Sequence, residues 1–207
     1  MNGYRDRTHA GDVLAADLAT YRGNTDVTVL GLVRGGVPVA HRVAHTLAVP
    51  LDVLVVRKLG VPWAPEVAFG ALGPGGIKVL NPDVANQLDD ADMAAVLAAE
   101  EAELNRREQA YRAGRPPLNL KTRIAILVDD GLATGATACA AVAVARSLDA
   151  ERVVMAVPVG AADAVARLAA VADEVHCPLV PHHFGAVSRF YRYFGQVSTG
   201  EVVALLG

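Results

Sequence analysis

Two adjacent carboxylates at the end of an apolar run are the strongest chemical pattern in the chain. The run 123–129 is short and rich in β-branched residues, and it ends in Asp129 and Asp130. Such a run is typical of a buried parallel strand, which would place both acids at the carboxyl edge of a sheet, where open α/β sheets bind ligands. Adjacent carboxylates repel each other unless a cation or sugar hydroxyls compensate them, and Mg²⁺ prefers one or two carboxylates plus ligand phosphates.

A loop of small residues follows the acids and precedes an alanine-rich run that is typical of a helix. Small side chains let backbone N–H groups approach an anion, and a helix N-terminus adds unpaired donors and partial positive charge. The residues of this loop are Ala133, Thr134, Gly135, Ala136 and Thr137. A hairpin turn at 130–131 is the alternative, but a second alternating strand would then have to follow. No Lys follows Gly135, so this is not a Walker P-loop, and no G-x-G-x-x-G joins a strand to a helix, so a dinucleotide fold is unsupported.

The segment Val128–Thr137, which reads VDDGLATGAT, resembles the phosphoribosyl pyrophosphate (PRPP) signature of type I phosphoribosyltransferases. The resemblance implies that Asp129 and Asp130 bind the ribose hydroxyls, act in catalysis and hold Mg²⁺. It also implies that residues 133–137 bind the 5′-phosphate of the donor.

A second anion site is expected where an earlier strand, 27–33, ends. Arg34 supplies a forked donor and Gly35 and Gly36 expose backbone N–H groups. The resemblance implies that this loop binds pyrophosphate, often through a non-proline cis peptide, and that a basic residue closing the next strand, 51–57, joins it. We assign Lys58 to that role and Arg57 second, because alternation predicts that one of the two faces the site.

The segment 59–76 is rich in glycine and proline and is expected to form a mobile loop or ribbon. Its position resembles that of the family's flexible catalytic loop, which covers the site. Glu66 is the single carboxylate between Leu59 and Asn81, and it is a candidate general acid or base. A solvated loop glutamate is the alternative, and the usual exposure of glutamate favours it.

Aromatic residues gather in the segment 180–195, which contains five of the nine Phe and Tyr residues. The resemblance implies a base-binding hood here, with Phe184 stacked on a nucleobase and Ala186 and Val187 beside it. For the later aromatics a hydrophobic mini-core or a dimer surface is an equal alternative. His182 and His183 are more typical of polar surface than of a metal site, because no third ligand is evident.

Composition and periodicity predict a single α/β domain over residues 1–207. Strands and helices alternate, which favours a doubly wound, mostly parallel sheet, and the resemblance implies a flexible loop and a small hood. Further strands are expected at 152–159 and 174–179, and helices at 10–21, 90–112 and 161–172. A net charge of −3 indicates no nucleic-acid partner. Neither a signal peptide nor a long apolar run is evident, which predicts a cytoplasmic protein without a membrane partner.

These features predict a phosphoribosyltransferase that displaces pyrophosphate from Mg²⁺·PRPP by a nitrogen nucleophile of a small heterocyclic acceptor, a nucleobase. A non-catalytic PRPP or nucleotide sensor with the same fold is the alternative. A phosphoribosyl hydrolase or a PRPP synthetase is a weaker one, and the synthetase would need an ATP site that the sequence does not offer. The sequence is most similar to stand-alone bacterial phosphoribosyltransferase-like proteins without an assigned acceptor. The resemblance also implies a homodimer.

Overall fold

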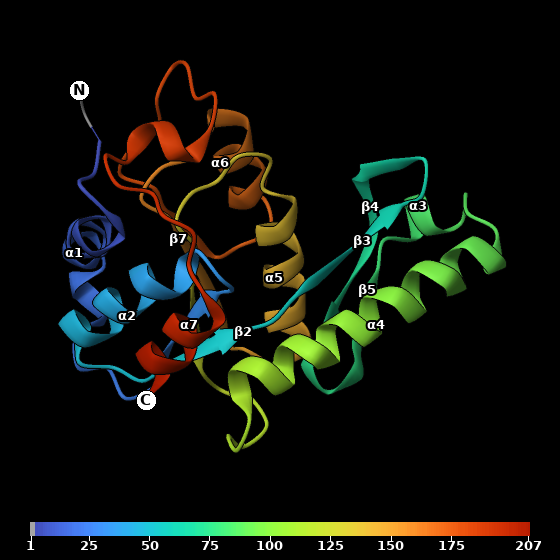
Figure 1. The fold of residues 1–207 in the computed structure, drawn as a ribbon, viewed down its shortest axis with the longest axis horizontal. Coiled ribbons are helices and arrows are strands. Elements are labelled where there is room, and N and C mark those ends of the chain that lie inside the picture. The colour runs from blue at the N-terminus through green and yellow to red at the C-terminus, as the bar shows by residue number, and fades with distance from the viewer. Residues whose placement is uncertain (1–2) are drawn as a thin grey trace.

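The computed structural model of the chain describes residues 3–207, except for the side chain of Glu66. Figure 1 shows a body of sheet and helices from which an arm projects. The body contains a five-stranded parallel sheet in the order β2-β1-β6-β7-β8. Its strands are β1 (Val27–Leu32), β2 (Leu51–Leu54), β6 (Ile124–Val128), β7 (Arg152–Ala156) and β8 (Glu174–His176). The predicted doubly wound, mostly parallel sheet is therefore confirmed.

Helices cover both faces of this sheet, because successive strand residues point to opposite sides. Leu30 and Leu127 pack with helices α5 and α6, whereas Val29 and Ile126 pack with α1 and α2. The helices of the body are α1 (Arg7–Asp17), α2 (Gly36–Leu47), α5 (Ala136–Ser147), α6 (Ala162–Ala169) and α7 (Thr199–Leu206). Among the described residues no helix is both long enough and apolar enough to cross a membrane.

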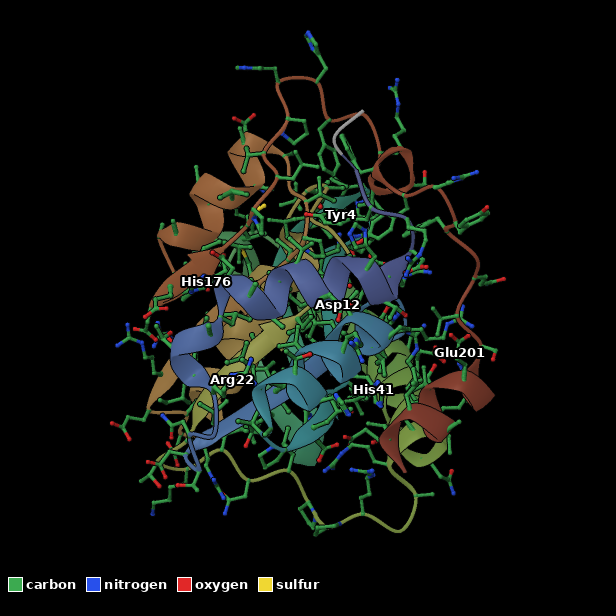
Figure 2. The ribbon with its side chains drawn as sticks, turned by 90° about the vertical axis from the view of Figure 1, so that its left-hand side faces the viewer. Tyr4, Asp12, Arg22, His41, His176 and Glu201 are labelled. Atoms are coloured by element: carbon green, nitrogen blue, oxygen red, sulfur yellow. The ribbon has the colours of Figure 1, made fainter. Side chains whose placement is uncertain are left out.

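Helix α1 begins three residues earlier than the expected helix 10–21. The carboxylate of Asp6 accepts a hydrogen bond from the backbone N–H of His9 at 2.8 Å and so caps the first turn. A separate 3₁₀ turn, Ala19–Tyr21, follows the helix. Figure 2 shows α1 lying against α2, where Asp12 and Arg42 form an ion pair with Oδ1 and Nε 2.6 Å apart.

The arm consists of residues 57–112 and carries a second sheet. Strands β3 (Arg57–Val61), β4 (Ala64–Gly73) and β5 (Ile77–Leu80) form an antiparallel ribbon, and the 3₁₀ turn Pro74–Gly76 separates the last two. The segment 59–76 is thus a ribbon rather than a loop. Residues 57 and 58 begin β3 instead of closing β2.

Of the two expected forms, loop and ribbon, the structure has the ribbon, and the glycines in its strands permit close packing. A Cβ atom at Gly73 would lie 2.2 Å from Cγ1 of Val144 in α5, so the ribbon rests directly on that helix. Register shifts beside Gly60 mark a local irregularity in the pairing of β3 and β4, as a β-bulge would produce.

Helix α4 (Asp90–Arg112) runs along the ribbon and matches the predicted helix 90–112. The short helix α3 (Pro82–Ala85) precedes it. Leu104 and Tyr111 of α4 are buried in a cluster with Leu59 and Phe69 of the ribbon. Because only these two of its 23 residues are buried, α4 is stabilised by its contact with the ribbon. The same contact buries apolar side chains of the ribbon.

Candidate active site

The acidic pair, Asp129 and Asp130, and the glycine loop, residues 34–36, meet at the carboxyl edge of the sheet. Strands β1 and β6 are neighbours, with Gly31 opposite Val128, so the segments that follow them lie side by side. The peptide bond Val33–Arg34 is cis, as the resemblance implies. A Cβ atom at Gly35 would lie 2.2 Å from Oδ2 of Asp130, and one at Gly36 would lie 2.4 Å from the carbonyl oxygen of Val128. Glycine at both positions lets this loop close onto the acids.

Asp129 and Asp130 are half-buried and held close together. The backbone N–H of Asp130 donates to Oδ1 of Asp129 at 2.9 Å. Burial raises the pKa of both carboxyls above their usual range, and the neighbouring charge of Asp130 raises that of Asp129 further. Positive charge or hydroxyl donors would therefore stabilise this pair of carboxyl groups.

Arg7, which the sequence analysis did not single out, supplies part of that charge. Its Nη2 and Nε donate to Oδ2 of Asp130 at 2.7 and 2.9 Å, and the two side chains are only 12% and 14% exposed. The guanidinium also lies 4.0 Å from the centre of the Phe194 ring and donates to the carbonyl oxygen of Gly195 at 2.7 Å. The capping residue Asp6 is the sequence signal that could have placed Arg7 at the start of a helix.

A cavity of about 440 Å³ opens in front of the acids. Arg7 and Arg34 line it together with Asp129 and Asp130, and residues 194–197 form another wall. The structure therefore brings the predicted residues Arg34 and Gly35 together with the acidic pair. The Arg34 guanidinium and the two carboxylates in one cavity suit a ligand that carries both phosphate and hydroxyls.

The loop 133–137 lies at the N-terminus of α5, as predicted. Gly135 precedes the helix with a φ of +78°, which favours glycine, and the backbone N–H of Ala136 donates to Oγ1 of Thr134 at 3.4 Å. Ala133, Thr134 and Thr137 are exposed. The first turn of α5 offers its backbone N–H groups here, which is the geometry of an anion site.

A second cavity, of about 520 Å³, brings Lys58 together with residues from the segment that follows β1 and from the loop 133–137. Its lining includes Val33 and Thr137 as well as Arg57 and Lys58. Both Arg57 and Lys58 thus line the cavity, although the alternation of side chains along a strand predicted that only one of them would face the site. The Nε atom of Arg57 pairs with Oε2 of Glu100 in α4 at 2.5 Å, which commits Arg57 to the arm. Glu66 belongs to β4, but its side chain lies outside the described residues.

The hood contains the 3₁₀ turn Val187–Phe190 and packs as a small aromatic core. Phe184 lies against Phe190 with ring centres 5.4 Å apart. Val187 covers the loop after the acids, since a Cβ atom at Gly131 would lie 2.5 Å from its Cγ1. Ala186 is exposed. The two cavities described above are not lined by the predicted base-binding residues Phe184, Ala186 and Val187. Phe194 lines the acidic cavity instead.

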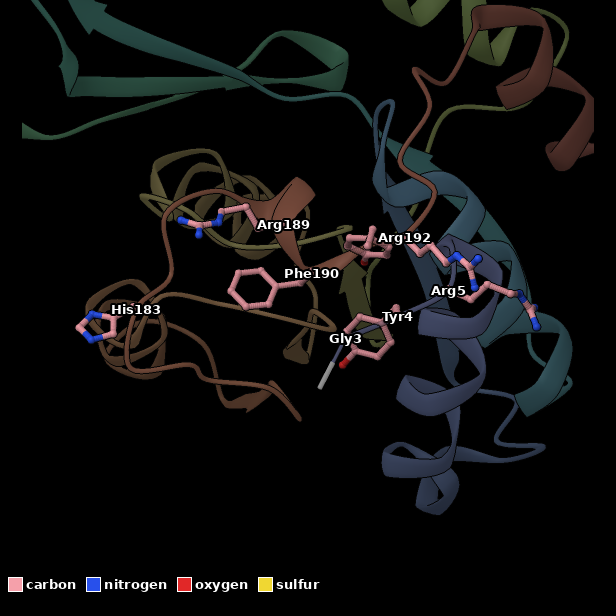
Figure 3. Close-up of a pocket in the computed structure, with 8 residues that line it drawn as sticks. Gly3, Tyr4, Arg5, His183, Arg189, Phe190 and Arg192 are labelled. Carbon is pink, nitrogen blue, oxygen red and sulfur yellow. The ribbon is translucent and has the colours of Figure 1, made fainter. Parts of the chain in front are cut away.

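A further cavity, of about 820 Å³, lies between the hood and the N-terminal segment. Figure 3 shows that its basic side chains do not converge, because Arg189 and Arg5 extend in opposite directions from Phe190. His182 and His183 are exposed, and the described residues contain no cluster of three or more metal-ligating side chains.

Comparisons with known proteins agree with this geometry. Residues 7–194 match the family described as the phosphoribosyl transferase domain. The chain is 55% identical over 208 residues to Rv0571c of Mycobacterium tuberculosis strain H37Rv, whose name describes it provisionally as a phosphoribosyl transferase, and to its counterpart MT0597 in strain CDC 1551. The match covers all of this chain and 47% of those proteins, so the chain spans about half their length. The crystal structure of TT1426 from Thermus thermophilus is 45% identical, with a TM-score of 0.92 over 99% of this chain and 97% of that one.

Proposed function

Because the chain belongs to the phosphoribosyl transferase family, we propose that it transfers the phosphoribosyl group of PRPP to a nitrogen nucleophile of a small heterocycle. The observation that carries the proposal is the adjacency of Asp129 and Asp130 to the loop 133–137 on one edge of the sheet. A ribose 5-phosphate needs hydroxyl acceptors and a phosphate cradle within one sugar's length of each other. Few other ligands need both.

In this proposal the donor is held at three points. The acidic pair accepts hydrogen bonds from the ribose hydroxyls, and the first turn of α5 with Thr134 and Thr137 binds the 5′-phosphate. Arg34, Gly35, Gly36 and Lys58 bind the pyrophosphate. Support for these contacts comes from two cavities: Arg34 and Gly35 line that of 440 Å³ together with the acids, and Lys58 and Thr137 line that of 520 Å³.

The reaction exchanges one bond at the anomeric carbon for another. The bond from that carbon to the pyrophosphate oxygen breaks and its electron pair leaves with pyrophosphate. The lone pair of the acceptor nitrogen forms the new C–N bond, and that nitrogen then loses a proton. Positive charge grows on the ribose as the first bond lengthens. Negative charge on the acids would stabilise it, and Arg34 and Lys58 would stabilise the leaving group. Glu66 is a candidate acceptor of the proton.

The magnesium ion that the family resemblance implies fits the donor set of the site. Mg²⁺ takes one or two carboxylates and completes its shell with ligand phosphates and water, so an acidic pair without further protein ligands is suitable. When bound, the ion would neutralise charge on the pyrophosphate. Asp129 and Asp130 are the residues that would hold it.

The acceptor is proposed to be a nucleobase that contacts the hood through Phe184, Ala186 and Val187. Val187 supports this placement, because it packs over Gly131 next to the acids. Phe194 is an additional aromatic candidate, since it lines the acidic cavity. We also propose that the longer relatives carry out the same reaction, and that this protein is cytoplasmic and forms a homodimer.

Pyrophosphate release from PRPP across a panel of purines, pyrimidines and other heterocycles tests the proposal. We expect one class of acceptor to release pyrophosphate, and the Asp129→Asn/Asp130→Asn variant to be inactive while its circular dichroism stays unchanged. Undiminished turnover in that folded variant would rule the assignment out.

A non-catalytic PRPP sensor is the second candidate, and the ion pair of Arg7 with Asp130 favours it, because one carboxylate is already engaged. Tight PRPP binding without release of pyrophosphate for any acceptor would select the sensor over the enzyme.

A further inference from the structure

Arg7 is joined to three different parts of the active-site wall. Nε and Nη2 both donate to Oδ2 of Asp130, and Nη1 donates to the carbonyl oxygen of Gly195. The face of the guanidinium rests on Phe194. All three nitrogens are therefore engaged, and a planar guanidinium is the side chain that can make these contacts at once.

The two acids consequently differ in what they can offer a ligand. Oδ2 of Asp130 is enclosed by Arg7 on one side and by Gly35 on the other, where not even a Cβ atom would fit. Asp129 receives a hydrogen bond from the backbone N–H of Asp130, and within residues 3–207 no cation pairs with it. Both acids line the same cavity, so Asp129 is the less committed carboxylate there.

We propose that Arg7 is a positioning residue that immobilises Asp130, so that within the acidic pair Asp129 is the main acceptor of hydrogen bonds from the ribose hydroxyls of PRPP. This inference rests on the proposed function. Arg7 acts through Asp130 rather than by touching the donor. The same contacts attach residues 194 and 195 to the acids, so Arg7 also fixes that part of the cavity lining.

Charge explains why the arrangement favours donor binding. PRPP carries several negative charges, and two half-buried carboxylates would repel it. Arg7 compensates one of those carboxylates before the donor binds. Removing one partner of a buried, hydrogen-bonded charge pair leaves the other unpaired and weakens binding substantially.

Calorimetric titration of the full chain with PRPP and Mg²⁺ measures the effect directly. We expect Arg7→Met to weaken binding at least about tenfold, and Arg7→Lys to recover part of the loss because it restores charge without the fork. Arg5→Met is the matched control, since Arg5 lies two residues away with its side chain 61% exposed, and it should bind within about twofold of wild type. Wild-type affinity in Arg7→Met would overturn the inference, even if its melting temperature fell.

A double-mutant cycle separates positioning from direct contact. Asp129→Asn should cost at least about tenfold in PRPP affinity and Asp130→Asn clearly less. In the Asp130→Asn background, Arg7→Met should cost less than about threefold, because its target has already been neutralised. An equal cost of Arg7→Met in both backgrounds would mean that Arg7 touches the donor, and the inference would be wrong. It would also be wrong if Asp130→Asn cost as much as Asp129→Asn. A wild-type chain that does not bind PRPP would instead refute the proposed function itself.

Discussion

A single methyl group at position 35 should disturb the active site more than its size suggests. Gly35 has a φ of −60° and a ψ of −33°, so alanine can adopt its backbone conformation without strain. The difficulty is space, because the new Cβ atom would lie 2.2 Å from Oδ2 of Asp130. That oxygen cannot move freely, since Arg7 holds it with two hydrogen bonds. Gly35→Ala must therefore displace Asp130 or the loop.

The expected cost is about 2 kcal/mol in the free energy of unfolding. Overpacking a closed site costs roughly 1–3 kcal/mol, and losing a buried ion pair outright can cost about 3–5 kcal/mol. Reduced freedom of the unfolded chain returns about 0.4–1 kcal/mol when glycine becomes alanine. A partial displacement of Asp130 places the net effect between these limits.

Urea unfolding followed by circular dichroism measures this cost. Gly200→Ala in α7 is the control, because no atom lies within 4 Å of its new Cβ position, and it should be neutral or stabilising by up to about 1 kcal/mol. In an Asp130→Ala background the cost of Gly35→Ala should fall below about 0.5 kcal/mol, since the obstacle is gone. A Gly35→Ala variant with wild-type stability would refute the reasoning, as would a cost that persists without Asp130.

Three further perturbations test other parts of the structure. Asp129→Asn should leave stability nearly unchanged at pH 3.5 but raise it by at least about 1–2 kcal/mol at pH 8.5 in urea unfolding. The reason is that burial raises the folded-state pKa of Asp129 from 3.8 to about 8, so the stability tied to its proton is lost as pH rises from the lower to the higher value; an equal pH dependence in both proteins would contradict this. Arg112→Met should destabilise by about 3 kcal/mol, because Arg112 and Asp52 form a buried pair with Nη2 and Oδ2 2.8 Å apart, and a loss below about 1 kcal/mol would show the pair to be dispensable. Gly73→Ala should increase the rate of amide hydrogen exchange in the ribbon, because the new Cβ atom would clash with Val144. Unchanged exchange rates would mean that α5 shifts to make room, and would contradict this prediction.

The elements with strong local patterns were predictable from the sequence. The strand before Asp129 is a continuous apolar run, so its burial and parallel pairing followed, and the helix 90–112 was found with its observed ends. The neighbouring position of the two loops also followed, because parallel strands present their carboxyl ends at one edge. Local pattern thus located the acids, the glycine loop and Arg34.

Contacts between distant parts of the chain were not predictable. Arg7 and Asp130 are 123 residues apart, and nothing near Arg7 distinguishes it from the exposed Arg5 except the cap that begins α1. The ribbon was ambiguous because glycine marks loops and close packing alike, and the answer depends on what lies opposite. In the hood, the resemblance favoured Phe184 as the residue that stacks on the base, whereas tertiary packing places Phe194 at the cavity beside the acids.

Helix α5 has a consequence that reaches beyond the loop at its start. Its first turn borders the cavity of Lys58, while Val144, two turns further on, is the surface on which Gly73 and the arm rest. In Figure 1 the helix stands between the body and the arm. The same helix therefore supports both the loop 133–137, which we propose holds the 5′-phosphate, and the ribbon that carries Lys58, which we propose binds the pyrophosphate. Because both proposed contacts depend on one helix, the distance between them is fixed. The fold would therefore set the length of a ligand that makes both contacts.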